Sequence, residues 1–247
     1  MLTLPRDDPQ AVAVRAAIEA GDLETLNHLL RVNPELARAR VGSKNDVTGL
    51  KGGRTLLHIA TDWPGHFPNG PAIVTALVAA GADVNARSLG AHEETPLHWA
   101  ASSDDVAVLD ALLDHGGDIE AGGSVIDGGT ALADAVAFGQ WQAARRLIER
   151  GARSNLWQSA ALGLIDRVEQ QFAGDALPTT EDVTNAFWCA CHGGQRETTE
   201  YLLARGADRN WIGYDKLTPL DAARRSEAND LAEWLVTQGA KSANQLS

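Results

Sequence analysis

The chain has 247 residues with 33 acidic and 21 basic side chains, and its formal net charge is −12. Because affinity for nucleic-acid phosphates needs clustered Lys and Arg, this charge argues against nucleic acid as a partner. The apolar share of 44% and the charged share of 22% argue against global disorder. No apolar run approaches the roughly 20 residues of a membrane span, and the first ten residues lack a signal-peptide core. These features predict a cytoplasmic protein that does not bind membranes.

A short motif recurs along the chain, and each copy opens with Thr or Asn. The clearest copy is Thr95–Ala101, and related copies open at Thr55, Thr130, Asn185 and Thr218. A Gly that begins a Gly-Ala-Asp-like triplet follows four of these five openings at the same distance of 21 residues, and follows the remaining one at 26. This constant spacing indicates a protein built from internal repeats.

Each repeat is predicted to be a pair of helices. Thr is a good N-cap, and Pro96 and Pro219 then occupy the first helical position, where a missing N–H costs nothing. Paired apolar residues recur at one offset in the second helix: Leu29-Leu30, Leu77-Val78, Leu112-Leu113, Leu147-Ile148, Leu202-Leu203 and Leu235-Val236. Because no repeat can bury this stripe alone, the repeats are expected to stack as one continuous domain over residues 1–247.

The Thr-Pro-Leu-His-x-Ala opening, with a period near 33 residues, resembles the ankyrin repeat. The resemblance covers roughly Val12 to Lys241 and implies an all-α solenoid of helix-turn-helix units with β-hairpin fingers, similar to stand-alone bacterial arrays. Seven repeats are expected to start near residues 12, 55, 95, 130, 154, 185 and 218, with the first and last acting as caps. The family further implies a binding scaffold that holds its partner on a concave face of fingers and first helices.

Departures from the regular repeat are the best functional clues, because insertions map to loops on one face. Residues 41–54 lengthen the connection between the first two repeats and are expected to form an extended finger. An insertion at 63–71 lengthens a turn between helices, whereas the connection from Gly151 to Ser154 has almost no finger. Long fingers followed by a gap predict a recess rather than an even groove.

Aromatic and acidic side chains are expected to gather on the concave face and to contact the partner. The predicted contact residues are Trp63, Glu93, Glu94, Trp99, Asp127, Asp134, Phe138, Trp157, Trp188, His192, Trp211, Tyr214 and Asp215. Trp188 takes a place that His usually occupies, so it either fills a junction between repeats or contacts the ligand. Asp134 is either a solvated acid, a partner of a finger hydrogen bond, or an acid, base or cation anchor. His58 and His98 are expected to hydrogen-bond to neighbouring backbone.

Two functions remain open at this stage, since the fold does not decide between them. The leading hypothesis is a monomeric, non-catalytic interaction protein that binds a neutral-to-basic peptide or protein segment. The alternative is a small-molecule-binding protein or a cofactor-free acid–base enzyme, with Asp62, Asp134 and His192 as catalytic candidates. No cofactor or metal is predicted, because Cys189 and His192 share a helix face without a second Cys pair to complete four ligands.

Overall fold

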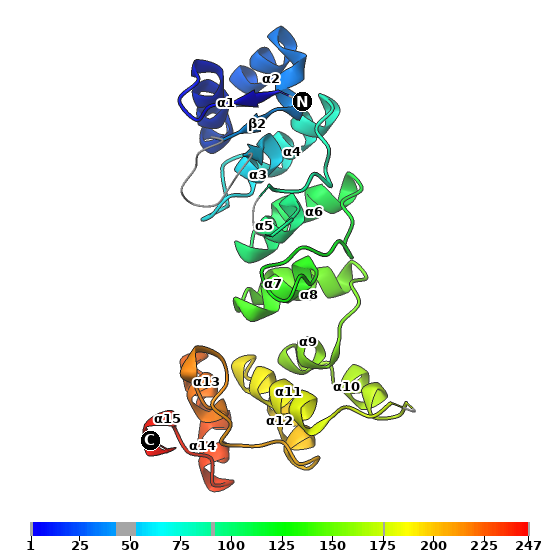
Figure 1. Cartoon of the computed structure of the whole chain (residues 1–247), viewed down its shortest axis with the longest axis vertical. Coiled ribbons are helices and arrows are strands. Elements are labelled where there is room, and N and C mark those ends of the chain that lie inside the picture. The colour runs from blue at the N-terminus through cyan, green and yellow to red at the C-terminus, as the bar shows by residue number, and fades with distance from the viewer. Residues whose placement is uncertain (1, 43–52, 90–91, 175, 247) are drawn as a thin grey trace. The chain divides into compact units, whose positions relative to one another are not determined.

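The computed structural model describes residues 2–42, 53–89, 92–174 and 176–246, and its regular structure is mainly helical (Figure 1). Within these residues seven helix pairs follow one another: α1 (Pro9–Ala20) and α2 (Leu23–Val32), α3 (Leu56–Ala60) and α4 (Gly70–Ala79), α5 (Pro96–Ser102) and α6 (Val106–Asp114), α7 (Ala131–Ala137) and α8 (Trp141–Glu149), α9 (Leu156–Ala161) and α10 (Ile165–Gln171), α11 (Thr180–His192) and α12 (Arg196–Leu203), α13 (Pro219–Arg225) and α14 (Asn229–Thr237). A short helix, α15 (Ala243–Leu246), and two 3₁₀ turns, η1 (Pro34–Arg38) and η2 (Tyr214–Lys216), complete the helical elements. The predicted helix-turn-helix repeats are confirmed.

The chain divides into two compact units, Met1–Ala152 and Arg153–Ser247. The first unit contains α1 to α8, and the second contains α9 to α15. The single domain expected over residues 1–247 stays a prediction. In the part of the chain that the structure describes, no helix is long and apolar enough to cross a membrane.

Three short strands lie at the start of the first unit. β1 (Thr3–Leu4) runs parallel to β2 (Arg40–Val41), and β2 pairs in antiparallel register with β3 (Arg54–Thr55). The β2–β3 pair forms the base of the finger expected at 41–54, of which residues 43–52 lie outside the described residues. The next finger is closed by a backbone bond of 2.7 Å from Ser88 N–H to the Glu94 carbonyl.

The core consists of small residues from the first helices and leucines from the second helices. One member of each predicted apolar pair is buried, namely Leu30, Leu77, Leu112, Leu147, Leu202 and Leu235. The matching first-helix residues are also buried: Ala60, Ala100, Ala135, Ala160, Ala190 and Ala223. Burial of one leucine contributes about 1.5–3 kcal/mol, so this recurring layer is a main source of stability in each unit.

Side-chain caps fix where the first helices begin. In α13 the Thr218 hydroxyl accepts from the Asp221 N–H at 3.3 Å, and the Asp221 carboxylate accepts from the Thr218 N–H at 3.3 Å. α11 begins at Thr180, ahead of the motif copy at Asn185, because Thr179 and Asp182 form the same reciprocal cap. Thr caps of this kind at Thr55, Thr95 and Thr218 explain why Thr opens these repeats, whereas Thr130 makes no side-chain cap bond.

The insertion at 63–71 packs on the repeats before and after it. The His66 N–H donates to the Asp105 carboxylate at 2.7 Å, and His66 Nε2 lies 3.0 Å from the Ser103 carbonyl. On the other side, a Cβ added at Gly21, where φ is +67°, would stand 2.2 Å from the Pro68 carbonyl oxygen. The insertion therefore packs between the turns of the preceding and the following repeat, while Trp63 at its start stays exposed.

Two buried histidines connect neighbouring repeats in the first unit. His58 Nδ1 lies 2.7 Å from Thr55 Oγ1, and its Nε2 lies 3.1 Å from the Glu94 carbonyl. His98 makes the same pair of contacts, at 2.9 Å to Thr95 Oγ1 and 3.3 Å to the Gly129 carbonyl. The predicted bonds to backbone are confirmed, and each imidazole joins the start of its own helix to the following finger.

Burial lowers the pKa of His58 to about 3 and that of His98 to about 4, from an ordinary value of 6.5. Below pH 6.5 the unfolded chain therefore takes up protons that the folded chain does not, and the free energy of unfolding falls as the pH falls. We expect His98→Gln to destabilise the protein by about 1–2 kcal/mol at pH 7. The variant's free energy of unfolding should then drop by about 1 kcal/mol less than that of the wild type between pH 6 and 5.

Urea unfolding at both pH values measures this difference, and His28→Gln, which changes an exposed histidine on α2, is the matched control. An identical acid slope in the wild type and the His98→Gln variant would contradict the buried neutral imidazole.

Candidate functional site

A shallow depression on the first unit, here called the tryptophan recess, brings together predicted contact residues from three segments. It is lined by Asp62 and Trp63 from the turn after α3, by Glu94 from the finger before α5, and by Trp99 of α5 itself. Its volume is about 180 Å³. Trp63 is 80% exposed, whereas Trp99 is partly buried. An exposed indole beside a half-covered one is an unusual feature for a surface that only faces water.

The ring of Trp99 is held on three sides. Its Nε1–H donates to Glu94 Oε2 at 3.2 Å. The His58 ring meets it edge-on, with centroids 4.9 Å apart, and the Arg54 guanidinium lies 5.1 Å from the Trp99 centroid. These contacts hold the Trp99 side chain in one conformation before a partner binds. Binding therefore costs less side-chain conformational entropy.

Two carboxylates give the recess its charge. Asp62 forms an ion pair with Arg54, so its charge is balanced within the chain. Burial raises the pKa of Glu94, although the bond from Trp99 opposes this shift. A partner cation next to Glu94 would offset that cost and favour the ionised carboxylate.

Asp134 lies on α7 and is completely buried. The Ser124 hydroxyl of the preceding finger donates to Asp134 Oδ1 at 2.6 Å, and Oδ2 has no hydrogen-bond partner among the described residues. Burial raises the pKa of Asp134 to about 7, helped by the nearby charge of Glu94. The exposed position predicted for Asp134 is wrong, because the finger covers it, and the alternative of a finger hydrogen bond is confirmed.

Asp134 is the fifth residue of its repeat, counted from the opening Thr130. In the other repeats this fifth residue is also less exposed than helical periodicity suggests. Its occupants Ile59, Ser159 and Cys189 are buried, and Trp99 is the partly exposed exception. Burial raises the pKa of Cys189 to about 12, so this thiol stays protonated at neutral pH. The fifth place of a first helix therefore serves packing in most repeats.

In the second unit, three predicted aromatic residues pack on one another. Trp188 is only 3% exposed and donates from Nε1 to the Leu217 carbonyl at 2.9 Å. Its ring meets that of Tyr214 at a centroid distance of 5.1 Å, and Tyr214 meets Trp211 at 5.9 Å. Burial of Trp188 favours the interpretation that it fills a junction between repeats, whereas Tyr214 remains half exposed.

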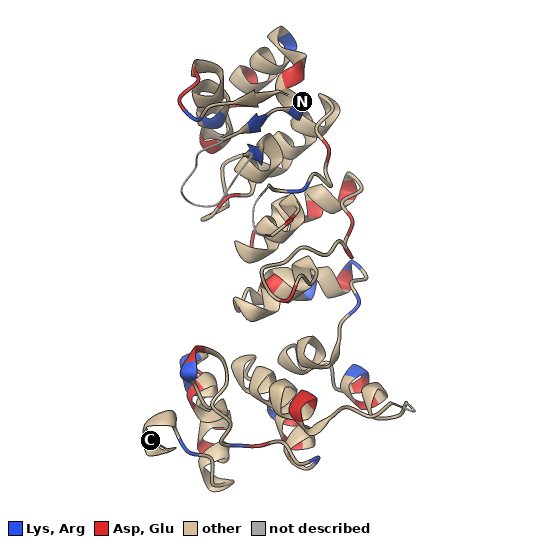
Figure 2. Ribbon diagram, in the orientation of Figure 1, with Lys and Arg blue, Asp and Glu red and all other residues tan. Residues whose placement is uncertain are grey.

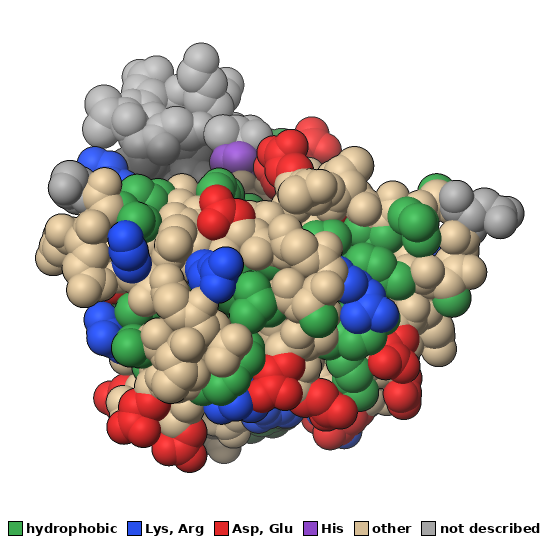
Figure 3. Space-filling view, turned by 90° about the horizontal axis from the view of Figure 1, so that it is seen from below, with side chains coloured by type: hydrophobic (Ala, Val, Ile, Leu, Met, Phe, Trp, Pro, Cys, Tyr) green, Lys and Arg blue, Asp and Glu red, His purple; other side chains and the backbone are tan. Residues whose placement is uncertain are grey.

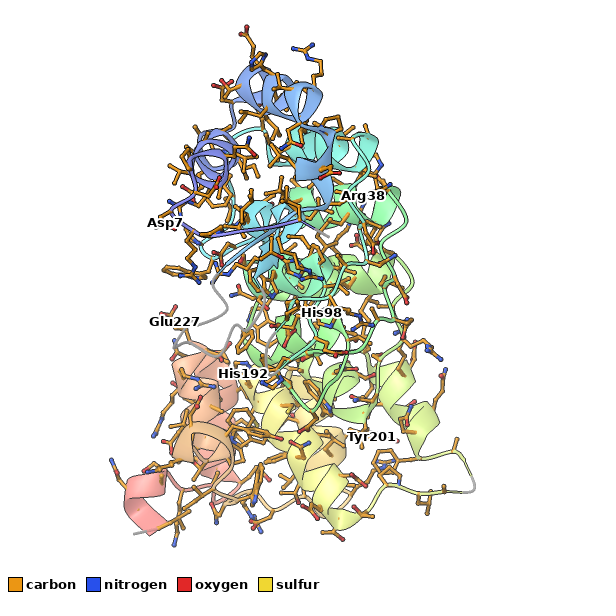
Figure 4. The ribbon with its side chains drawn as sticks, turned by 45° about the horizontal axis from the view of Figure 1, so that its top comes forward. Asp7, Arg38, His98, His192, Tyr201 and Glu227 are labelled. Carbon is orange, nitrogen blue, oxygen red and sulfur yellow. The ribbon has the colours of Figure 1, made fainter. Side chains whose placement is uncertain are left out.

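His192 and Asp215 border this aromatic cluster. The His192 ring lies 5.6 Å from that of Trp188, and the Ser226 hydroxyl donates to the His192 carbonyl at 2.6 Å. Asp215 pairs with Arg225 at 2.5 Å. His192 therefore belongs to the second unit, while Asp62 and Asp134 belong to the first (His98 and His192 are labelled in Figure 4).

Trp157 lines a separate depression of about 340 Å³ in the second unit. Leu177, which is 65% exposed, and the side chains of Asn155 and Asn185 lie around it. Leu177 was not among the predicted contact residues, because it lies in the connection after the repeat that starts near residue 154 and carries no repeat motif.

The remaining predicted contact residues lie on the surface of the first unit. Glu93 and Asp127 are exposed finger residues, and Phe138 is 49% exposed at the end of α7. On the face that Figure 3 shows, hydrophobic side chains gather in small groups separated by acidic and basic ones. The sequence analysis also missed Arg54 and Ser124, which stand outside the repeat motif and act through contacts that only the folded fingers create.

Comparisons with known proteins agree with this repeat architecture. The chain matches the family model described as ankyrin repeats (3 copies) over residues 12–121 and 66–158. A stretch of 60 residues is 50% identical to the RelA-associated inhibitor of Mus musculus, and it represents 24% of this chain and 7% of that protein. The chain therefore spans only a small part of the length of this relative.

A solved structure shows the same fold. The crystal structure of the human ASB11 ankyrin repeat domain matches with a TM-score of 0.51 and 19% sequence identity, over 91% of this chain and 96% of that chain. At this level of identity the match concerns the arrangement of helices alone.

The raised pKa of Asp134 makes stability depend on pH in the opposite sense to the histidines. Between pH 4 and 7 the folded chain holds a proton that the unfolded chain has released, so the free energy of unfolding falls as the pH rises. In Asp134→Asn this contribution is absent. We expect the wild type to lose about 2 kcal/mol more than this variant between pH 5 and 8, measured by urea unfolding.

The control is Asp127→Asn, which changes an exposed carboxylate on the finger that covers Asp134. This control should keep the wild-type pH dependence, and an unchanged pH dependence in Asp134→Asn would show that Asp134 is ionised in the folded protein.

Proposed function

Since this chain belongs to the ankyrin-repeat family, whose repeats generally mediate protein–protein interaction, we propose that it binds a neutral-to-basic peptide or protein segment at the tryptophan recess. The observation that carries the proposal is the 80% exposure of Trp63 beside Trp99 and Glu94. Aromatic residues in such positions supply the desolvated anchors that dominate many interfaces. The partner's apolar or cationic side chain would cover Trp63 and lie against the Trp99 ring.

The size of the recess supports a macromolecular partner. Its volume of about 180 Å³ accommodates one side chain, whereas small-molecule sites usually have roughly 300–1,000 Å³. A side chain held there leaves the rest of a polypeptide to extend over neighbouring surface. Glu93, Asp127 and Phe138 are exposed on the same unit and are proposed as further contacts.

Charge favours a partner with Lys or Arg. One oxygen of Glu94 is engaged by Trp99, and the other accepts no hydrogen bond from the described residues. Arg54 already places a guanidinium over the Trp99 ring, so a partner cation would lie beside Glu94 and against the exposed Trp63 indole. An incoming cation would add a charge-assisted bond to the open Glu94 oxygen.

The acid–base alternative receives less support from the geometry. Asp62 lines the tryptophan recess, but its carboxylate is paired with Arg54, and Asp134 is enclosed beneath Ser124, so neither carboxylate is placed to exchange protons with a substrate. In the second unit, Trp157 and the exposed Leu177 are proposed as a separate contact area for the partner.

The proposal is tested with a random decapeptide library displayed on phage and selected on the full chain. For the selected peptides, Trp63→Ala should weaken binding at least tenfold, because truncating an anchor indole costs about 1.4 kcal/mol or more. Glu94→Gln should weaken the binding of Lys- or Arg-containing peptides in particular. Isothermal titration calorimetry measures both effects.

Val32→Ala is the matched control, since Val32 is 71% exposed on α2 and lies outside the recess. Its affinity should equal that of the wild type. Peptides that bind all of these proteins equally well would place the binding face elsewhere on the chain.

A further inference from the structure

The finger that leads to α7 is attached to its helix differently from the fingers before α3 and α5. In the two preceding repeats the fourth residue is a histidine that bonds to the opening Thr. In the repeat of α7 the fourth residue is Ala133, and Thr130 makes no side-chain cap bond. A bond of 2.6 Å between Ser124 and Asp134 connects this finger to α7 instead. Figure 2 shows acidic segments both in α7 and in the loop before it.

The tip of this finger, residues 123–129, is here called the Ser124 turn. Its backbone bonds link its own residues: Gly123 N–H donates to the Gly128 carbonyl at 2.9 Å, and Ser124 N–H donates to the Gly129 carbonyl at 3.0 Å. Ser124 is completely buried, whereas the other six residues of the turn are exposed or partly exposed. A segment with one buried side chain and mainly internal bonds can open locally while the helices stay folded.

The Ser124 hydroxyl is the contact between this turn and the buried acid. It accepts from the Ile126 N–H at 2.8 Å and donates to Asp134 Oδ1. Asp134 is completely buried, and its Oδ2 has no hydrogen-bond partner among the described residues. An ionised oxygen without a partner is costly to bury, whereas a protonated carboxyl group carries no charge. The closed turn therefore stabilises the protonated acid relative to the ionised one.

The charge closest in effect to Asp134 strengthens this preference. Burial raises the pKa of Asp134 to about 7, and the charge of Glu94, on the finger before α5, adds to the shift. The Ser124 hydroxyl and the Val125 N–H act in the opposite direction, because both favour the ionised carboxylate. Their effect is too small to restore the ordinary pKa of an aspartate.

The other charged groups on the elements around α7 have contacts of their own or face solvent. His98 of α5 bonds to this finger and is neutral above pH 5, because burial lowers its pKa to about 4. Arg87 donates to two backbone carbonyls, and Arg146 and Arg150 of α8 pair with Asp110. The exposed members of this set are His92, Glu93, Asp127, Arg145 and Glu149.

We propose that the Ser124 turn is a pH-dependent conformational switch. It closes over protonated Asp134 and opens locally as Asp134 ionises, because the ionised Oδ2 needs water that the closed turn excludes. Asp127, one of the proposed partner contacts, lies on this turn, so the switch would determine how firmly that contact is held. The switch itself does not depend on the proposed function.

Acid closes the turn and base opens it. Asp134 has a pKa of about 7 in the closed form, and its pKa in the open form is the ordinary value of 3.8. Between these two values each pH unit raises the ratio of open to closed turns about tenfold, and above pH 7 this ratio levels off. Between pH 5 and 8 the ratio therefore rises on the order of 50- to 100-fold.

The test is amide hydrogen exchange of the full chain, followed by NMR between pH 5 and 8 and corrected for the intrinsic exchange rate at each pH. In the wild type the protection of the Ser124 and Gly128 amides should fall by the same factor as the ratio rises. In Asp134→Asn it should stay constant, because the side-chain amide does not titrate. Asp127→Asn, which removes an exposed carboxylate from the same turn, should behave like the wild type.

Global unfolding also exposes Asp134, so urea is used to separate the two kinds of opening. In 1 M urea the protection of the Leu147 amide, which lies in α8, should fall, whereas that of Ser124 should not change, because local opening exposes little surface. The proposal is overturned if the protection of the turn does not depend on pH, if Asp134→Asn keeps the wild-type pH dependence, or if the Ser124 and Leu147 amides respond equally to urea.

Discussion

Each helix pair in this chain has an apolar stripe that only a neighbouring pair can cover. In the first unit Leu77, Leu112 and Leu147 are fully buried at equivalent places on successive second helices. The small side chains of Ala100 and Ala135 let the first helices approach each other above this layer. Because the stripe has to meet its counterpart, the helices of each repeat keep one arrangement, whereas the turns and connections can change length, as the insertion at 63–71 and the finger at 41–54 do.

The fingers differ in length, and they determine which side chains of the first helices are exposed to solvent. Glu94 of one finger supplies its carbonyl to His58 and its carboxylate to Trp99, so a single finger residue connects two repeats and orients an indole. Ser124 of the next finger closes over Asp134. Exposure at the tryptophan recess therefore depends on finger contacts more than on helix periodicity.

The sequence is sufficient to predict the helix pairs, because Thr caps and paired apolar residues act within one repeat. His58 and His98 were predictable because they take the His place of the repeat signature, although their bonds reach the finger of the next repeat. Asp134 was placed wrongly, because the group that buries it, Ser124, stands ten residues earlier in the chain and no local pattern connects the two.

The tertiary contacts of the second unit could not be predicted from the sequence either. Trp188 occupies a place that looked available to a ligand, and its burial depends on the Leu217 carbonyl, 29 residues further along the chain.

Binding at the tryptophan recess is tested most directly by following the indole N–H signals of the seven Trp residues by ¹H–¹⁵N NMR while a selected peptide is added. The signals of Trp63 and Trp99 should shift with the peptide concentration, and those of Trp141 and Trp234 on second helices should stay in place. Shifts confined to Trp141 or Trp234, with Trp63 and Trp99 unchanged, would contradict the proposed binding face.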